Sequence, residues 1–431
     1  MDPFLIVLLG IGAMFVLILF HVPVGIAMMV VGVGGYAILV GVRPALSTLV
    51  SETAGNIENP GLAVIPLFLL MGSFATAGGL SSEIYRFANA FLGHRKGGLA
   101  FATMGGCGVF GAVCGSSTAT AATFGRVALP EMLKRGYAPH FAAGTIAAGG
   151  TLGALVPPSV IMIIYAVVTR ENILDLFVAA VVPAVLAILF HFGAIRLYLM
   201  RNPDAAPAGQ RFTWRERWQA TKSAWAVLIL LIAVLGGIYG GVTTVDEAAA
   251  LGAMLSLAFA ILRRRLTWRS FWGALVESAA ATAMIYIVIF GASVFAYFIT
   301  VARVPPALTA WIGGLDLAPL MIIFVLLIVY IILGAIFDTV SAMLITLPFV
   351  LPIVVHLGYD PIWWGIINVV VVELGMITPP IGMNVFVLHG LAPNISLSRI
   401  FGGVMPFVLS DLARLIVLTL FPILTLYLVK G

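Results

Sequence analysis

One motif occurs twice in this chain, and in each copy glycines and a proline pair interrupt an apolar run. The first copy is residues 149–159 (GGTLGALVPPS), the second is residues 373–381 (ELGMITPPI), and the two proline pairs are 222 residues apart. Glycine weakens a helix, and proline removes one of its hydrogen bonds. Each copy therefore predicts a broken helix, and the pair indicates two broken helices that face one site.

The spacing of 222 residues also relates shorter motifs elsewhere in the chain. The Leu-Pro pair at 129–130 recurs at 351–352, and the turn at 136–139 recurs at 358–361. A shared register over about fifty residues indicates an internal repeat, which is typical of membrane transporters.

The composition places most of the chain in lipid. Of the 431 residues, 62% are hydrophobic and 9% are charged, whereas soluble domains are about half apolar and a quarter charged. The net charge of +5 is spread over short loops, which favours the cytoplasmic side of a membrane protein over a nucleic-acid partner. Long charge-free runs predict bilayer-spanning helices: Phe4–Phe20, Val24–Val42, Ala224–Val245 and Leu317–Phe337. We expect the first of them to be a retained helix rather than a signal peptide.

Two segments are too short to span a bilayer, and a polar tip separates them. Phe101–Val113 and Thr118–Leu133 flank Gly115, Ser116 and Ser117. We expect a re-entrant hairpin, which is tolerated only where protein or a water-filled cavity surrounds the tip. A second hairpin is expected with its tip at residues 337–339. At a spacing of 222, Ser116 aligns with Asp338 and Ser117 with Thr339.

The predicted fold is an all-α polytopic membrane protein with two inverted repeats, each holding a re-entrant hairpin and a broken helix. The predicted boundaries are 1–199 for the first repeat (hairpin 99–135, broken helix 140–169), 200–222 for a polar linker, and 223–431 for the second repeat (hairpin 317–356, broken helix 361–391). Four smaller expectations are a loop or surface segment at 43–59, an interfacial helix at 80–92, a surface piece at 267–275 and a single last helix at 400–429.

The charges predict how the two repeats are oriented. The linker carries five basic residues against two acidic ones, so we expect it in the cytoplasm. The turn after the first hairpin carries Lys134 and Arg135, whereas its counterpart carries His356 and Asp360 without any Lys or Arg. The two turns should therefore lie on opposite sides of the membrane, which means an inverted repeat with both termini outside.

Hydroxyl groups and interrupted backbone at the tips suit sodium, because freed carbonyls ligate a cation without burying more charge. We expect one sodium between the first tip and the first break, and a second between the second tip and the second break. The predicted sodium ligands are Gly115, Ser116, Ser117, Thr151, Gly153, Asp338, Thr339, Glu373, Gly375 and Thr378. An anionic substrate would lie between the tips, where free N–H groups of half-helices bind anions. The predicted substrate contacts are Ser116, Ser117, Thr118, Arg126, Thr339 and Asn384.

Several of these residues have a second interpretation. Serine and threonine in membrane helices often bond to their own backbone. Asp338 is costly inside a membrane, but it could simply cap the helix that begins at Thr339. Glu373 could bind an ion, take up a proton or pair with Arg126, and Arg126 could instead extend to the membrane interface. Cys107 and Cys114 are seven residues apart on one helix face, too far for a disulfide, and are expected to be packing residues.

Enzyme motifs are absent from the sequence. It contains no GxSxG, no HExxH and no Walker loop, so we expect a protein that is not an enzyme and does not hydrolyse ATP.

Four runs of residues resemble the large membrane subunit of tripartite ATP-independent periplasmic (TRAP) transporters. They are residues 115–122, 126–132, 147–159 and 373–387. The resemblance implies sodium-driven import of an organic acid across a bacterial inner membrane by an elevator-type fold. It also implies two partners, which are a periplasmic substrate-binding protein and a separate small membrane subunit of about four helices.

Two other functions stay open at this stage. One is a stand-alone sodium–dicarboxylate symporter of a related elevator fold. The other is a channel or a purely structural membrane subunit, although a scaffold would have no use for two costly polar tips. Dicarboxylates, keto acids, sugar acids and sialic acids are all compatible with the sequence as cargo.

Overall fold

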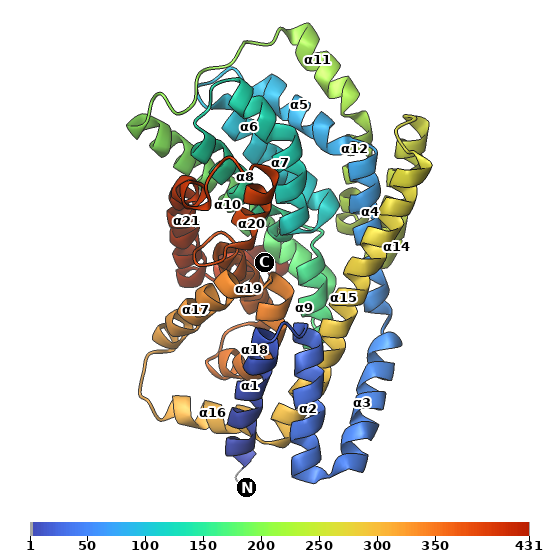
Figure 1. The fold of residues 1–431 in the computed structure, drawn as a ribbon, viewed down its shortest axis with the longest axis vertical. Helices are drawn as coiled ribbons and strands as arrows, with labels where there is room; N and C mark the ends of the chain where they lie inside the picture. Colours follow the sequence, from blue (N-terminus) through green and yellow to red (C-terminus); the bar gives the residue numbers. More distant parts are fainter. Residues whose placement is uncertain (1–2, 431) are drawn as a thin grey trace.

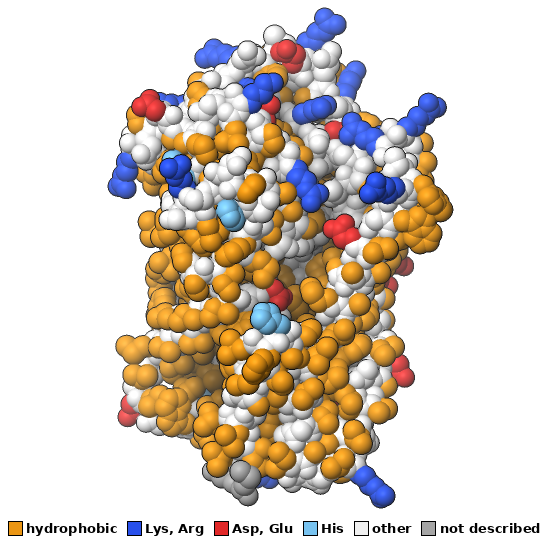
Figure 2. Space-filling view, in the orientation of Figure 1, with side chains coloured by type: hydrophobic (Ala, Val, Ile, Leu, Met, Phe, Trp, Pro, Cys, Tyr) orange, Lys and Arg blue, Asp and Glu red, His pale blue; other side chains and the backbone are white. Residues whose placement is uncertain are grey.

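The computed structural model describes residues 3–430, and helices make up almost all of them (Figure 1). In this range the one β pairing is an isolated bridge between Lys96 and Ala208. Seven of the described helices are long and apolar enough to cross a membrane, or up to nine if each bent pair counts as one span. The sides of the molecule are mostly hydrophobic, and Lys and Arg side chains gather at one end (Figure 2). This is the architecture of an all-α polytopic membrane protein.

The first half of the chain forms ten helices: α1 (Pro3–Leu19), α2 (Val24–Val40), α3 (Val42–Ile57), α4 (Pro60–Ala77), α5 (Leu80–Leu92), α6 (Gly98–Cys114), α7 (Ser117–Lys134), α8 (Pro139–Leu155), α9 (Val160–Thr169) and α10 (Ile173–Arg201). The hairpin predicted here is α6 and α7. The predicted broken helix is α8 and α9, which are bent by 40° at the break.

The second half forms the remaining helices: α11 (Trp214–Ser223), α12 (Trp225–Leu231), the π-helical turn η1 (Ile232–Gly236), α13 (Gly237–Tyr239), α14 (Val245–Leu262), α15 (Trp268–Val301), α16 (Val304–Gly313), α17 (Pro319–Ile336), α18 (Thr339–His356), α19 (Pro361–Gly375), α20 (Met383–Leu391), α21 (Leu397–Leu420) and α22 (Ile423–Lys430). The second hairpin is α17 and α18, and the second broken helix is α19 and α20.

The spacing of 222 residues relates whole helices as well as motifs. Adding it to the bounds of α7 gives 339–356, which are the bounds of α18. Adding it to α5 gives 302–314, where the short helix α16 lies. In Figure 1, α5 and the first hairpin lie toward the end that carries α11. The helix α16 and the second hairpin lie toward the other end, which the N-terminus marks.

Two surface segments predicted from the sequence are in fact helical. Residues 43–59, expected as a loop or surface segment, form most of α3, and a new helix begins where Asn59 accepts a hydrogen bond from the Gly61 N–H. Residues 267–275 are not a separate piece, because they are the cap and first turns of α15, a helix of 34 residues. The positions of α15 that match Asn59 and Pro60 are Ala281 and Thr282, and neither interrupts a helix.

The linker and the last helix also differ from the prediction. The end of the linker forms α11, because Thr213 and Glu216 make a reciprocal capping box at its start. The expected single helix at 400–429 is two helices, α21 and α22, which are separated at Phe421 and Pro422.

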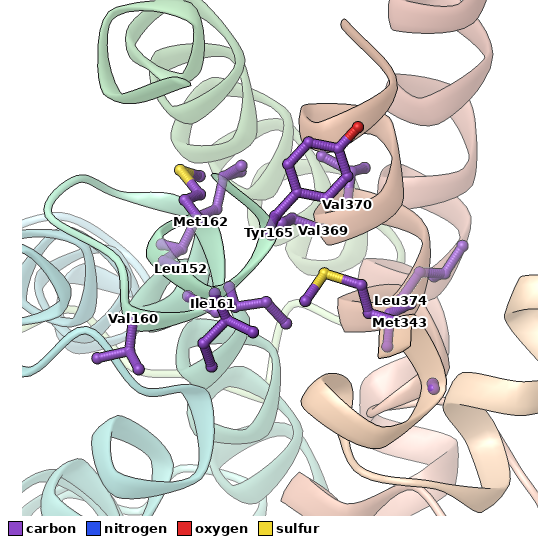
Figure 3. Packing of buried hydrophobic residues seen from close by; sticks show 14 of the residues in the cluster. Leu152, Val160, Ile161, Met162, Tyr165, Met343, Val369, Val370 and Leu374 are labelled. Carbon is purple, nitrogen blue, oxygen red and sulfur yellow. The ribbon is translucent and has the colours of Figure 1, made fainter. Parts of the chain in front are cut away.

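The two broken helices pack against each other in the core (Figure 3). The buried side chain of Tyr165 on α9 lies beside Val369 and Val370 of α19. The hydroxyl of Tyr165 donates a hydrogen bond of 2.6 Å to the carbonyl oxygen of Pro361. One hydrophobic core therefore joins the two halves and positions both hairpin tips.

Candidate functional site

Each hairpin tip carries a side chain that caps the helix after it. The hydroxyl of Ser116 accepts a hydrogen bond of 3.5 Å from the Ala119 N–H at the start of α7. The carboxylate of Asp338 accepts two, of 3.1 and 3.2 Å, from the N–H groups of Val340 and Ser341 at the start of α18. Serine and aspartate are preferred at this position because they satisfy otherwise unpaired N–H groups. The capping interpretation of Asp338 is therefore present in the structure.

The first tip is held against the first helix break. The N–H of Val160 donates to the carbonyl oxygen of Gly115 at 3.4 Å. A Cβ added at Gly153 would lie 2.5 Å from the carbonyl oxygen of Ser116 and 2.4 Å from the hydroxyl of Thr120. A side chain at this position would push the tip away from the break, so the close approach requires glycine.

The second tip is held in the same way. The N–H groups of Ile381 and Gly382 donate to the carbonyl oxygen of Ala335 at 3.3 and 3.4 Å. A Cβ added at Gly375 would lie 2.6 Å from the Cα of Gly334. Each hairpin thus contacts the break of its own half through glycine.

A chain of buried polar side chains connects the two halves. The side-chain amide of Asn384 on α20 donates to the hydroxyl of Ser117 at 2.8 Å and to the carbonyl oxygen of Ala147 at 3.2 Å. The hydroxyl of Thr339 donates to the carboxylate of Glu373 on α19 at 3.0 Å. These contacts bring both hairpin tips to the second broken helix.

Two oxygens of this cluster lack a hydrogen-bond partner. They are Oε2 of Glu373 and Oδ1 of Asn384, and their side chains are 1% and 0% exposed. A buried carboxylate oxygen without a donor is costly unless a cation balances it. No ion pair involves Glu373 within residues 3–430. The cluster can therefore offer oxygen ligands to a hard cation, with hydroxyls from both tips nearby.

Other predicted site residues lie close to these groups. The hydroxyl of Thr118 is 3.5 Å from that of Ser116. Thr151 donates a hydrogen bond of 2.7 Å to the carbonyl oxygen of Ala148 in its own helix, and Thr378, in the second break, donates one of 2.7 Å to the carbonyl oxygen of Leu374. Both threonines keep acceptor capacity after making these bonds.

Two predicted residues lie apart from the cluster. Arg126 is exposed on α7, nine residues after Ser117, which is about 14 Å along the helix axis. It lines a cavity of about 400 Å³ beside the end of α20, and it makes no ion pair with Glu373. Asp338 lines a different cavity, of about 380 Å³, with residues of α2 and α15. The carboxylate that bonds to a tip hydroxyl is that of Glu373.

The two proline pairs share one backbone feature and differ in exposure. The peptide bonds Pro157–Pro158 and Pro379–Pro380 are both cis. The first pair is buried, and the second is exposed. The two breaks are thus similar in local structure, but only the second reaches the surface of this chain.

Sequence analysis missed several buried polar residues. Asn368 is fully buried, and neither polar atom of its amide has a hydrogen-bond partner. The side chains of His191, Asp411 and Arg414 form a buried cluster between α10 and α21, with distances to the aspartate of 3.0 and 2.9 Å. In each case the available signal was a polar residue inside an apolar run, which marks a functional or paired group in a membrane helix.

The chain is similar in sequence to one family of transport proteins over almost its whole length. The family model described as "Tripartite ATP-independent periplasmic transporter, DctM component" matches residues 11–424. The C4-dicarboxylate TRAP transporter large permease protein DctM of Pseudomonas aeruginosa is 37% identical over 396 residues, covering 91% of this chain and 92% of that protein. The isethionate TRAP transporter permease protein DctMQ of Oleidesulfovibrio alaskensis is 33% identical, covering 99% of this chain and 66% of that protein.

A solved structure has the same fold at low sequence identity. The YdaH transporter of Alcanivorax borkumensis superposes with a TM-score of 0.62 at 15% identity, covering 89% of each chain.

Proposed function

The chain belongs to the DctM component of tripartite ATP-independent periplasmic transporters, and we propose that it uses a sodium gradient to import an organic acid. It is a multi-pass protein of the bacterial inner membrane and not an enzyme. The proposed partners are a periplasmic protein that delivers the acid and a small membrane subunit. The relative named DctMQ supports the small membrane subunit as a partner. This chain matches only 66% of that protein, which leaves room for a second component in the same polypeptide.

The buried carboxylate of Glu373 carries the sodium assignment. One of its oxygens accepts a hydrogen bond from Thr339, and the other has no partner. Sodium beside this oxygen would balance the charge, and Thr339 together with backbone oxygens of Gly375–Thr378 would supply neutral ligands. Asp338 would act on this site through its charge rather than as a direct ligand. This is the first of two proposed sodium sites.

The second proposed sodium site lies at the first tip. Carbonyl and hydroxyl oxygens of Gly115, Ser116 and Ser117 would contribute, with Thr151 and Gly153 on the facing helix. The close packing of Gly153 against Ser116 supports this assignment, because it brings backbone carbonyls of two elements together. The acid would lie between the tips, in contact with Ser116, Ser117, Thr118, Thr339 and Asn384.

Transport would follow an elevator mechanism. The hairpins and broken helices would move together, because the buried polar chain and the shared core join them. The basic end of the molecule, which carries α11, would face the cytoplasm, and the end that carries α3 and α16 would face outward.

Reconstitution of the complete system tests this function. The chain and its small subunit would be placed in proteoliposomes, and uptake would be measured with loaded binding protein outside and an inward sodium gradient. We expect accumulation only when all three components and sodium are present. Uptake without the binding protein would instead fit a stand-alone symporter, and it would overturn the tripartite proposal.

A further inference from the structure

A groove with a lining separate from the tip residues lies between helices of both halves. Its volume is about 830 Å³. One wall is formed by α3, α15 and α16, and the other by α9 and α18. It lies in the half of the molecule that carries α3 and α16, away from α11 (Figure 1). Hydroxyl and amide side chains line it, among them Ser51, Asn56, Asn59 and Ser293. Leu, Val, Ala and Pro side chains form most of the rest of the lining, so the groove combines apolar surface with a few polar groups, as small-molecule sites do.

Two charged side chains line the groove, one on each wall. Glu52 lies on α3, and Arg170 directly follows α9. Neither has an ion-pair partner within residues 3–430, so both charges are available to a ligand. Glu171 is not part of the groove. Partial burial of its carboxyl, and after it the negative charges of Asp360 and Asp175, raise the pKa of Glu171.

The groove is connected to the tips by the helices that form its second wall. The helix α9 begins at Val160, which is bonded to the first tip, and its residues from Val167 to its end at Thr169 line the groove. The helix α18 begins at the second tip and passes along the groove from Leu344 onward. The groove therefore begins about 11 Å from the first tip along α9 and about 8 Å from the second tip along α18.

We propose that this groove is an outer reception site for an organic acid that also carries a hydroxyl or ammonium group. Arg170 binds the carboxylate, because its planar guanidinium matches the two carboxylate oxygens. Glu52 accepts hydrogen bonds from the donor group on the same molecule. A plain dicarboxylate fits less well, because its second carboxylate meets the charge of Glu52. The inference rests on the proposed function, since it gives the transported acid an entry site.

Thiol protection measures binding in this groove directly. Thr300 lines the groove, is exposed and bonds only to its own helix, so a T300C variant can be labelled there. Cys107 and Cys114 are buried and should give little background. A membrane-impermeant maleimide would be applied from the outer face of membrane vesicles, without sodium. The probes are gluconate, a hydroxylated acid, and succinate, a plain dicarboxylate.

We expect gluconate to slow labelling of T300C more strongly than succinate does. Arg170→Gln should weaken protection by gluconate at least about tenfold, because a hydrogen bond to a charged group is lost. Arg170→Lys should retain part of it. Glu52→Gln should strengthen protection by succinate about fivefold, because a repulsion of about 1 kcal/mol is removed. Arg43→Gln is the matched control, since Arg43 is exposed on the same helix as Glu52 but outside the groove.

Three results would overturn the inference. They are no protection by either acid, protection unchanged in Arg170→Gln, and labelling only from the basic face. The assay needs neither sodium nor the binding protein. A loss of sodium-driven uptake with groove protection intact would therefore reject the proposed function alone.

Discussion

Replacement of Asn384 by alanine should weaken sodium binding, because this side chain holds the first tip against the second broken helix. Its amide donates to the hydroxyl of Ser117 and to the carbonyl oxygen of Ala147, and it is fully buried. Asn384→Ala removes both bonds and leaves the hydroxyl and the carbonyl without their donor. The tip hydroxyl then loses its fixed position.

The expected size follows from these two bonds. A typical intramolecular hydrogen bond contributes about 1 kcal/mol, so the two bonds set an upper bound of about 2 kcal/mol, or a factor of about 30, on the rise in the sodium dissociation constant; this bound is reached if sodium binding depends fully on both bonds. A double-mutant cycle with Ser117→Ala measures the coupling between the two side chains in sodium binding, since Ser117→Ala removes both the bond and a proposed sodium ligand. Its interaction energy should be about 1 to 1.5 kcal/mol.

Sodium titration of the purified protein provides the assay. Thermal stability or tryptophan fluorescence would be followed as sodium replaces choline at constant ionic strength. Thr145→Ala is the matched control, because Thr145 is fully buried in α8 and bonds only to the carbonyl oxygen of Phe141 in its own helix. That variant should keep the sodium affinity of the unmodified protein.

Additive effects of the two substitutions on sodium affinity would contradict this prediction. If the effects of Asn384→Ala and Ser117→Ala on sodium affinity add within about 0.5 kcal/mol, the two side chains do not act together. An unchanged sodium affinity in Asn384→Ala would show that the hydrogen bonds from Asn384 to Ser117 and Ala147 do not support the ion site.

Three further predictions concern single residues. Glu373→Gln should raise the Tm in sodium-free buffer, because an unpaired buried carboxylate oxygen is removed. It should also abolish the increase in Tm that sodium causes, and a full sodium effect in this variant would exclude Glu373 as the charge partner of the ion. Gly153→Ala should lower the Tm, since its Cβ would lie 2.4 Å from a hydroxyl, whereas Gly193→Ala, with nothing within 4 Å, should not; equal melting temperatures would contradict the close approach. Asp411→Asn should destabilise the protein by about 3 to 5 kcal/mol in denaturant unfolding, because Arg414 loses its buried partner; a change below 1 kcal/mol would mean that the ion pair is not important for stability.

The repeat made much of the fold predictable. A single spacing located both hairpins and both broken helices, because glycine and proline interrupt helices wherever they occur inside apolar runs. The same spacing would also have located α16 as the counterpart of α5. That helix was missed because its apolar pattern is short and begins with two prolines after Val304.

Local composition predicted the helix boundaries less well in two places, α3 and α15. The polar content of α3 suggested a loop, although a helix needs no long apolar run when only part of its surface is buried. The continuity of α15 depends on one position, because Thr282 stands where the first half has Pro60.

The sequence indicated which elements meet at the candidate site, but not how each side chain is oriented there. Both tips converge on Glu373 and Asn384, which were among the candidates. Ser116 aligns with Asp338, and in the structure both side chains cap the helix that follows, although capping was expected for Asp338 alone. It could not tell which carboxylate faces the tips, because that depends on how α18 and α19 are rotated against each other.

Simultaneous measurement of sodium and substrate flux is the most direct test of coupling. Proteoliposomes holding the chain and its small subunit would receive loaded binding protein and radioactive sodium outside. We predict that sodium enters together with the acid in a constant ratio, and that Glu373→Gln lowers both fluxes in parallel. Accumulation of the acid without accompanying sodium entry would contradict sodium coupling at the buried cluster.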